Sequence, residues 1–114
     1  MDFEDDLTIV EGAFDAIVAG PNAVPLLGST LRETSKLFQE IVRNDTTVYM
    51  ALDPDVRKKE IKIIELLLKY GIEVYKVSLT EYNDVGEMSQ EIFHQRKNNS
   101  VFIKDKFYLF MKVY

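Results

Sequence analysis

The chain has 114 residues, of which 46% are hydrophobic and 29% charged, proportions that are ordinary for one globular domain. Its net charge of -5 argues against binding of nucleic acid through an overall basic surface. The absence of cysteine excludes disulfides, cysteine nucleophiles and zinc ribbons within this sequence. Its apolar runs are too short to cross a membrane and its acidic N-terminus does not resemble a signal peptide, so we expect a cytoplasmic protein.

Short apolar runs alternate with stretches of helical spacing along most of the chain. Ser29 or Thr30 would cap the second predicted helix, Asp55 would cap the third, and Gly71 would end the third. In chain order the predicted elements are a strand over 7–10, a helix over 13–19, a strand over 23–27, a helix ending near 44–45, a strand over 48–52, a helix over 56–70, a strand over 72–77 and a helix over 85–95.

This alternation predicts an α/β fold, with a four-stranded parallel sheet flanked by helices and joined by right-handed crossovers. We expect one domain over residues 1–100. In residues 101–114 apolar and basic residues alternate, which favours an edge strand or a hairpin around 104–106, with a helix as the alternative.

The third predicted helix has an apolar face and a basic face. The apolar residues are Ile61, Ile64, Leu67 and Leu68, and the basic cluster is Arg57, Lys58, Lys59 and Lys62. The cluster is either a local contact for nucleic acid or a solvated helix face. Lys58, close to Asp55, is the candidate for a position near a phosphate group.

Acidic side chains gather where the predicted strands end. Glu11 follows the first strand, Asp53 and Asp55 follow the third, Asp84 lies just beyond the fourth, and Asp15 lies one turn into the first helix. Functional groups of open parallel sheets collect beyond the carboxyl ends of the strands. Crowded carboxylates repel one another unless a cation neutralises them, and Mg²⁺ prefers such oxygen ligands together with substrate phosphates. Asp and Glu at loop ends are also common as simple caps.

The residues resemble the Toprim family, which occurs in bacterial-type DNA primases, topoisomerases and certain nucleases. An apolar strand closed by Glu11-Gly12, with Asp15 four residues after the glutamate, is similar to the first primase signature, and Asp53-Pro54-Asp55 is similar to the second. Residues 23–31 and Asn83-Asp84 resemble two further primase segments in the family's order. Where the family carries a second acid after the aspartate, this chain has Gly86.

The resemblance implies roles for these residues. Glu11, Asp15, Asp53 and Asp55 would be the catalytic residues, and Glu11, Asp53, Asp55 and Asp84 would bind Mg²⁺ or Mn²⁺, with Gly12 and Lys58 close to phosphate. Two metal ions can stabilise the attacking and the leaving oxygen of a phosphoryl transfer.

The resemblance implies the catalytic Toprim core of a DNA primase, a nucleotidyltransferase that makes RNA primers in DNA replication in a bacterial or phage-infected cell. Its partners would be a DNA template, an RNA primer, nucleoside triphosphates, and a helicase or other primase domains, on which its activity would depend. No membrane partner is expected. A Toprim nuclease that cleaves phosphodiesters and a non-catalytic Toprim scaffold in a replication complex are the alternatives.

Overall fold

One sheet organises the chain. The computed structural model describes residues 1–105, which form a sheet of order β2-β1-β3-β4-β5. The first four strands pair in parallel and the fifth runs antiparallel to β4. The strands are β1 (Leu7–Val10), β2 (Ala23–Pro25), β3 (Val48–Ala51), β4 (Val74–Lys76) and β5 (Val101–Phe102).

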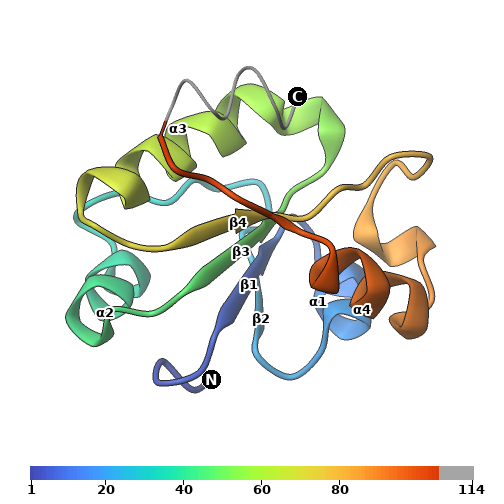
Figure 1. Ribbon diagram of the computed structural model, residues 1–114, viewed down its shortest axis with the longest axis horizontal. Helices are drawn as coiled ribbons and strands as arrows, with labels where there is room; N and C mark the ends of the chain where they lie inside the picture. The colour runs from blue at the N-terminus through green and yellow to red at the C-terminus, as the bar shows by residue number, and fades with distance from the viewer. Residues whose placement is uncertain (106–114) are drawn as a thin grey trace.

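Helices cover both faces of this sheet (Figure 1). One face carries α2 (Lys36–Asn44) and α3 (Arg57–Lys69), and the other carries α1 (Ala13–Ala19) and α4 (Gln90–Asn98). Two short 3₁₀ helices, η1 (Pro54–Val56) and η2 (Val85–Glu87), follow β3 and β4. The predicted α/β class, a largely parallel sheet flanked by helices, is confirmed. β5 adds an antiparallel edge strand to the four parallel strands and lies in residues 101–114, where an edge strand or a hairpin was expected.

Each face has its own hydrophobic core. Under α2 and α3, residues such as Phe38, Ile64 and Leu67 pack on the sheet, and under α1 and α4 the buried Phe93 packs against Val10. All four residues of β1 are buried, because this central strand is covered on both faces.

The second helix begins later than predicted, so the cap expected at Ser29 or Thr30 is wrong. α2 starts at Lys36, and Ser35 Oγ accepts a hydrogen bond from the Phe38 N–H at 3.1 Å. Ser29 Oγ instead donates to the Leu26 carbonyl oxygen at 2.6 Å. Leu27, with φ 54°, lies in the left-handed region, which turns the chain away from a helix at this point.

Asp55 does not cap the third helix. It lies inside η1, and the helix α3 that follows begins at Arg57. Its buried residues are Glu60, Ile63, Ile64 and Leu67, whereas the predicted core residues Ile61 and Leu68 are only partly buried. The rotation of the helix therefore places a glutamate, which no apolar pattern predicts, against the sheet.

The predicted helix over 85–95 is divided. Val85–Glu87 forms η2, Met88 is extended, and α4 starts at Gln90 with Ser89 Oγ accepting from the Ile92 N–H at 3.1 Å. Ser89 and Asp84 are both N-cap residues with side-chain bonds, so two caps compete with one continuous helix.

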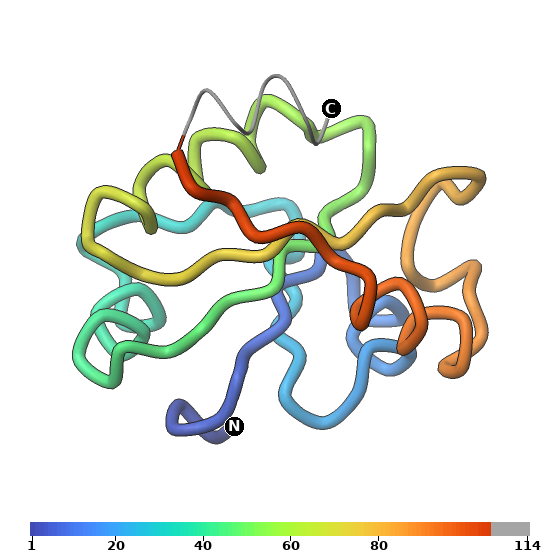
Figure 2. Tube along the Cα trace, viewed as in Figure 1, coloured from blue at the N-terminus to red at the C-terminus, as the bar shows by residue number. Residues whose placement is uncertain are grey.

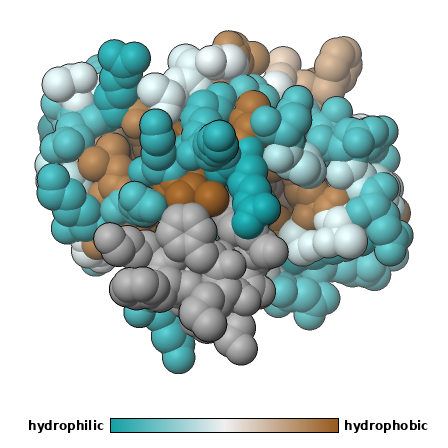
Figure 3. Space-filling model, turned by 90° about the horizontal axis from the view of Figure 1, so that it is seen from above, coloured by the Kyte–Doolittle hydropathy of each residue, from teal (hydrophilic) through white to brown (hydrophobic). Residues whose placement is uncertain are grey.

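The C-terminal part of the predicted extension, from residue 106 on, lies outside the described residues, and so does most of the predicted hairpin. Between residues 1 and 105 the helices are all too short or too polar to cross a membrane. On the surface shown in Figure 3, hydrophobic residues form small islands among hydrophilic ones.

The strand order creates a switch point between β1 and β3. From β1 the chain moves through α1 to β2 on one side, then returns through α2 to β3 on the other side, a path that can be followed in Figure 2. The two connections diverge beyond the carboxyl ends of β1 and β3, where ligands bind in open α/β sheets. Glu11 and Asp53 stand directly beyond these two strand ends.

Candidate functional site

A hollow of about 430 Å³ lies at the switch point. Four of the five predicted acids line it, together with backbone from α1 and η2. The lining residues are Glu11, Gly12, Ala13, Phe14, Asp15, Asp53, Asp84, Gly86 and Glu87. The tertiary structure thus brings together residues from distant parts of the chain, such as Glu11 and Asp84.

Asp15 links two loops through hydrogen bonds. Its side chain is buried, with Oδ2 accepting from the Gly12 N–H at 2.8 Å and Oδ1 accepting from the Gly86 N–H at 2.6 Å. Hydrogen bonds from backbone N–H groups to a carboxylate are among the stronger ones in proteins. Asp15 therefore holds the turn after β1 against η2, and so fixes the shape of the hollow.

Gly86 lies close to two carboxylates at this contact. A Cβ at this position would lie 3.0 Å from Asp15 Oδ1 and 3.3 Å from Asp84 Oδ1. These contacts are tighter than usual, so the acid that the family pattern carries at this place would require the two carboxylates to shift by a few tenths of an ångström. Gly12 is similar, because a Cβ there would lie 3.2 Å from Asp15 Oδ2.

Asp84 caps η2 at the rim of the hollow. Its Oδ1 accepts from the Glu87 N–H at 3.0 Å, and Glu87 Oε1 in turn accepts from the Asn83 N–H at 2.5 Å. Both carboxylates thus stabilise the loop that they belong to. They add negative charge to the hollow at the same time.

Glu11 forms an ion pair with Lys59, which the sequence pattern does not distinguish from the neighbouring lysines. Lys59 Nζ lies 2.8 Å from Glu11 Oε1 and 2.9 Å from the Ser29 carbonyl oxygen. The other oxygen, Glu11 Oε2, is buried and has no hydrogen-bond partner among the described residues. The predicted Lys58 is exposed and does not line the hollow. Lys58 and Lys59 both belong to the basic cluster. Because α3 begins at Arg57, its turn directs Lys59, and not Lys58, toward Glu11.

Asp53 carries the strongest electrostatic signal of the site. Burial and then the charges of Asp15, Asp84, Asp55 and Glu11 raise its pKa from 3.8 to about 6. Its Oδ1 is buried and has no hydrogen-bond partner within residues 1–105. An unpaired buried carboxylate oxygen among other acids is a position that a proton or a bound cation would stabilise.

Asp55 stands apart from the other four acids. It is exposed and does not line the hollow, although its charge acts on Asp53. It is therefore the predicted ligand that the geometry supports least.

The donor set fits a weakly held Mg²⁺ or Mn²⁺ rather than a closed metal cage. Within residues 1–105 no three Asp, Glu, His or Cys side chains are arranged to hold a metal ion by themselves. Magnesium is usually held by one or two carboxylates and completed by water and substrate phosphates. The two unpartnered oxygens, Glu11 Oε2 and Asp53 Oδ1, match that requirement.

A scan against protein-family models finds no match, and a search of the curated proteins finds none. A solved structure described as the Aquifex aeolicus primase, zinc binding and RNA polymerase domains, is similar to the chain with a TM-score of 0.67 and 30% sequence identity. The match covers 85% of this chain and 26% of that one, so the chain spans about a quarter of the primase structure.

This likeness extends over most of the chain and includes the sequence as well as the fold. The chain is therefore similar, in fold and in sequence, to a segment of a primase structure.

Proposed function

We propose that the chain is a Toprim domain and forms the metal-binding catalytic core of a DNA primase, with Mg²⁺ or Mn²⁺ held at the acidic hollow. The observation that carries the proposal is the pair of buried, unpartnered oxygens on Glu11 and Asp53 at the switch point of the sheet. The likeness to a primase structure supports the same assignment.

In this proposal Glu11 and Asp53 hold the metal ions, and Asp84 and Asp55 add negative charge from the rim. Bound metal supplies electrostatic stabilisation of the charge that develops on the transferred phosphoryl group. Asp15 acts through position, because it binds the backbone of Gly12 and Gly86 and keeps the hollow in shape. Lys59 holds Glu11 in place from the side opposite its unpartnered oxygen.

The substrates would be nucleoside triphosphates and the 3′-hydroxyl of an RNA primer on a DNA template. The net charge of -5 disfavours strong binding of the template by this chain alone. Template binding would therefore depend on other primase domains or on a helicase, in agreement with the small part of the primase structure that the chain covers.

A non-catalytic scaffold is the second candidate, and one observation favours it. The Lys59 ammonium at 2.8 Å already neutralises Glu11, as a metal ion would. A Toprim nuclease would use the same acids, and no contact of the described residues favours it over nucleotidyl transfer.

Metal binding tests the proposal. Backbone amide shifts are followed while Mg²⁺ or Mn²⁺ is added to the wild type, to Asp53→Asn and to the control Asp45→Asn. Asp45 is exposed, lies just before β3 at the opposite end of the sheet and has φ 50°, a conformation that asparagine tolerates.

We expect saturable shifts around Glu11, Asp15 and Asp84 in the wild type and in Asp45→Asn, and none in Asp53→Asn. Primer synthesis with added primase domains and helicase then tests the reaction itself, and nicking of DNA tests the nuclease. A wild type that shows no specific shift, with or without a nucleoside triphosphate, is the result that the scaffold predicts.

A further inference from the structure

A second hollow, which none of the predicted site residues lines, lies under the loop after β4. It has a volume of about 350 Å³ and is formed between the end of β3, the start of α3 and the loop over residues 77–82. Its lining residues are Leu52, Pro54, Arg57, Glu60, Lys76, Ser78, Leu79, Thr80, Glu81 and Tyr82. We call it the β4 pocket.

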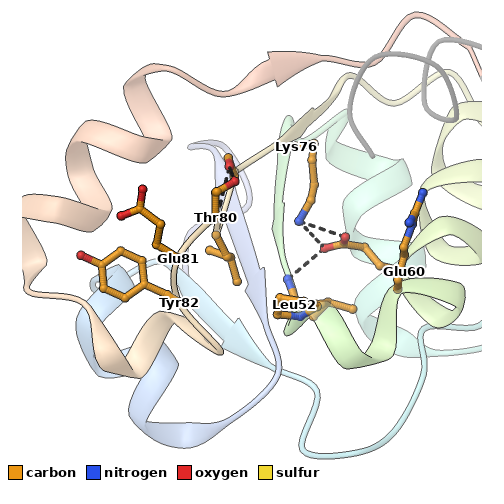
Figure 4. Close-up of a pocket in the computed structure, with 10 residues that line it drawn as sticks. Leu52, Glu60, Lys76, Thr80, Glu81 and Tyr82 are labelled. Atoms are coloured by element: carbon orange, nitrogen blue, oxygen red, sulfur yellow. Dashed lines mark hydrogen bonds and ion pairs between the residues drawn. The ribbon is translucent and has the colours of Figure 1, made fainter.

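The floor of the β4 pocket is a buried ion pair. Lys76 Nζ lies 3.0 Å from Glu60 Oε1, and Glu60 Oε2 accepts from the Leu52 N–H at 2.9 Å. Lys76 is 7% exposed and Glu60 is 2% exposed. Figure 4 shows the two side chains pointing toward each other at one side of the pocket. Burying two charges is costly, and these two are bonded to each other while both line the cavity, so they form a fixed polar floor for a ligand.

The walls and the mouth differ from the floor. Leu52, Pro54 and Leu79 contribute apolar surface, and Ser78 and Thr80 contribute hydroxyl groups whose oxygens lie 2.8 Å apart. Glu81, on the side opposite the ion pair in Figure 4, has φ 79°, a conformation that is strained for this residue type. Backbone strain of this kind is concentrated at ligand sites and switches.

The charges of the lining select the class of ligand. Two basic residues, Arg57 and Lys76, and two acidic ones, Glu60 and Glu81, line the β4 pocket, so the charges cancel. A phosphate group would meet carboxylates there, and a metal ion would meet cations. A flat, uncharged molecule with hydrogen-bonding edges fits apolar walls and a polar floor, and the volume is in the range of small-molecule sites.

The two hollows share one turn of the chain. Asp53 lines the acidic hollow and its neighbour Pro54 lines the β4 pocket. Both hollows lie beyond the carboxyl ends of parallel strands, where open α/β sheets bind their ligands. A nucleotide that lies across the Asp53-Pro54 turn would have its phosphates on one side and its nucleoside on the other.

We propose that the β4 pocket binds the nucleoside part of a ribonucleotide whose phosphates lie at the acidic hollow. This inference rests on the proposed function for its choice of ligand. The probes are adenosine, which has no phosphate, and ATP with Mg²⁺, each added to the full chain while backbone amide shifts are followed.

We expect adenosine to shift the amides of Leu52, Leu79 and Thr80, and Mg²⁺ with ATP to shift these and the amides around Glu11. Thr80→Tyr places a ring in the mouth of the pocket and should weaken both by about tenfold or more. Thr34→Tyr makes the same change at an exposed threonine away from the β4 pocket and should leave binding unchanged. Ser78→Tyr serves in place of Thr80→Tyr if that variant does not fold.

The failures of the two proposals are distinguishable. If adenosine produces no shift in the β4 pocket of the wild type, or shifts Thr80→Tyr and Ser78→Tyr as it shifts the wild type, the nucleoside site is disproved, whatever the metal does. If adenosine shifts the pocket but Mg²⁺ shifts nothing around Glu11, the nucleoside site stands and the catalytic proposal fails. In Asp53→Asn we expect adenosine to bind as in the wild type.

Discussion

Two groups of charged side chains lie at the same end of the sheet and follow opposite electrostatic rules. Lys76 and Glu60 form a buried pair on one side of the Asp53-Pro54 turn, with their charges in balance. On the other side, Asp53 faces four acids, and its pKa rises to about 6. The comparison teaches that the fold tolerates full burial of charge where a partner is built in, and leaves charge unbalanced at the acidic hollow, where we propose that a cation binds.

The largest effect is expected from breaking the balanced pair. Lys76→Met removes the ammonium beside the buried Glu60 carboxylate and should lower the free energy of unfolding by about 3–5 kcal/mol. Urea denaturation measures this loss. The double variant Lys76→Met/Glu60→Gln removes both charges, retains an oxygen that can accept from the Leu52 N–H, and should recover most of the stability. If the single variant is as stable as the wild type, the pair contributes nothing to the fold.

The next effect concerns the bridge that shapes the acidic hollow. Asp15→Ala removes the acceptor of the Gly12 and Gly86 N–H groups and should destabilise the fold by about 2–3 kcal/mol. Hydrogen exchange should become faster at these two amides before it does in the sheet. Asp15→Asn retains one acceptor oxygen and should lie between wild type and alanine. Unchanged exchange at Gly86 would contradict a bridging role.

At the acidic hollow, removing a charge should raise the free energy of unfolding instead of lowering it. Because the pKa of Asp53 is raised in the folded state, the wild type loses stability as pH rises from 3.8 through about 6. Asp53→Asn avoids this loss and should be more stable at pH 7 by about 1–2 kcal/mol, after allowance for screening by solvent. Near pH 3 both proteins carry a neutral side chain, and the difference should vanish. Urea denaturation at both pH values decides, and a destabilised Asp53→Asn at pH 7 would show that Asp53 has a favourable partner.

The smallest expected effect is a difference in Mg²⁺ affinity between variants of two neighbouring lysines, Lys59 and Lys58. Lys59→Met should change stability by less than about 1 kcal/mol, since the Glu11 pair is partly solvated. It should strengthen Mg²⁺ binding by about threefold to tenfold, because a competing cation leaves Glu11. Lys58→Met is the matched control, since Lys58 is exposed and outside the hollow, and should bind Mg²⁺ like the wild type. Equal affinities for all three proteins would mean that Lys59 does not compete with metal.

Local sequence signals predicted the strands and the starts of α1 and α3 within about two residues, but missed the starts of α2 and α4. The apolar runs at 7–10 and 48–52 match β1 and β3 within a residue, because buried parallel strands need continuous apolar segments. The start of α2 was missed because Ser29, Thr30 and Ser35 are equally good caps, and only the backbone at Leu27 and Gly28 excludes the first two.

The candidate site was predicted in part for a related reason. Acids that follow strands must meet at one edge of a parallel sheet, so Glu11, Asp53 and Asp84 could be grouped from the sequence. Asp15 as a bridge and Lys59 as the partner of Glu11 depend on contacts over 71 and 48 residues, which leave no local pattern.

By itself, the sequence determined the alternation of strands and helices and the end of the sheet at which the acids gather, because both follow from apolar periodicity and strand direction. Only the tertiary structure decided which charges are balanced. Lys76 lies on the same buried face as Ile72 and Val74, and Glu60 lies on the buried face of α3. Each would be an unpaired buried charge without the other. The energy of a buried charge depends on its neighbours in space, and the fold supplies those neighbours from distant parts of the chain.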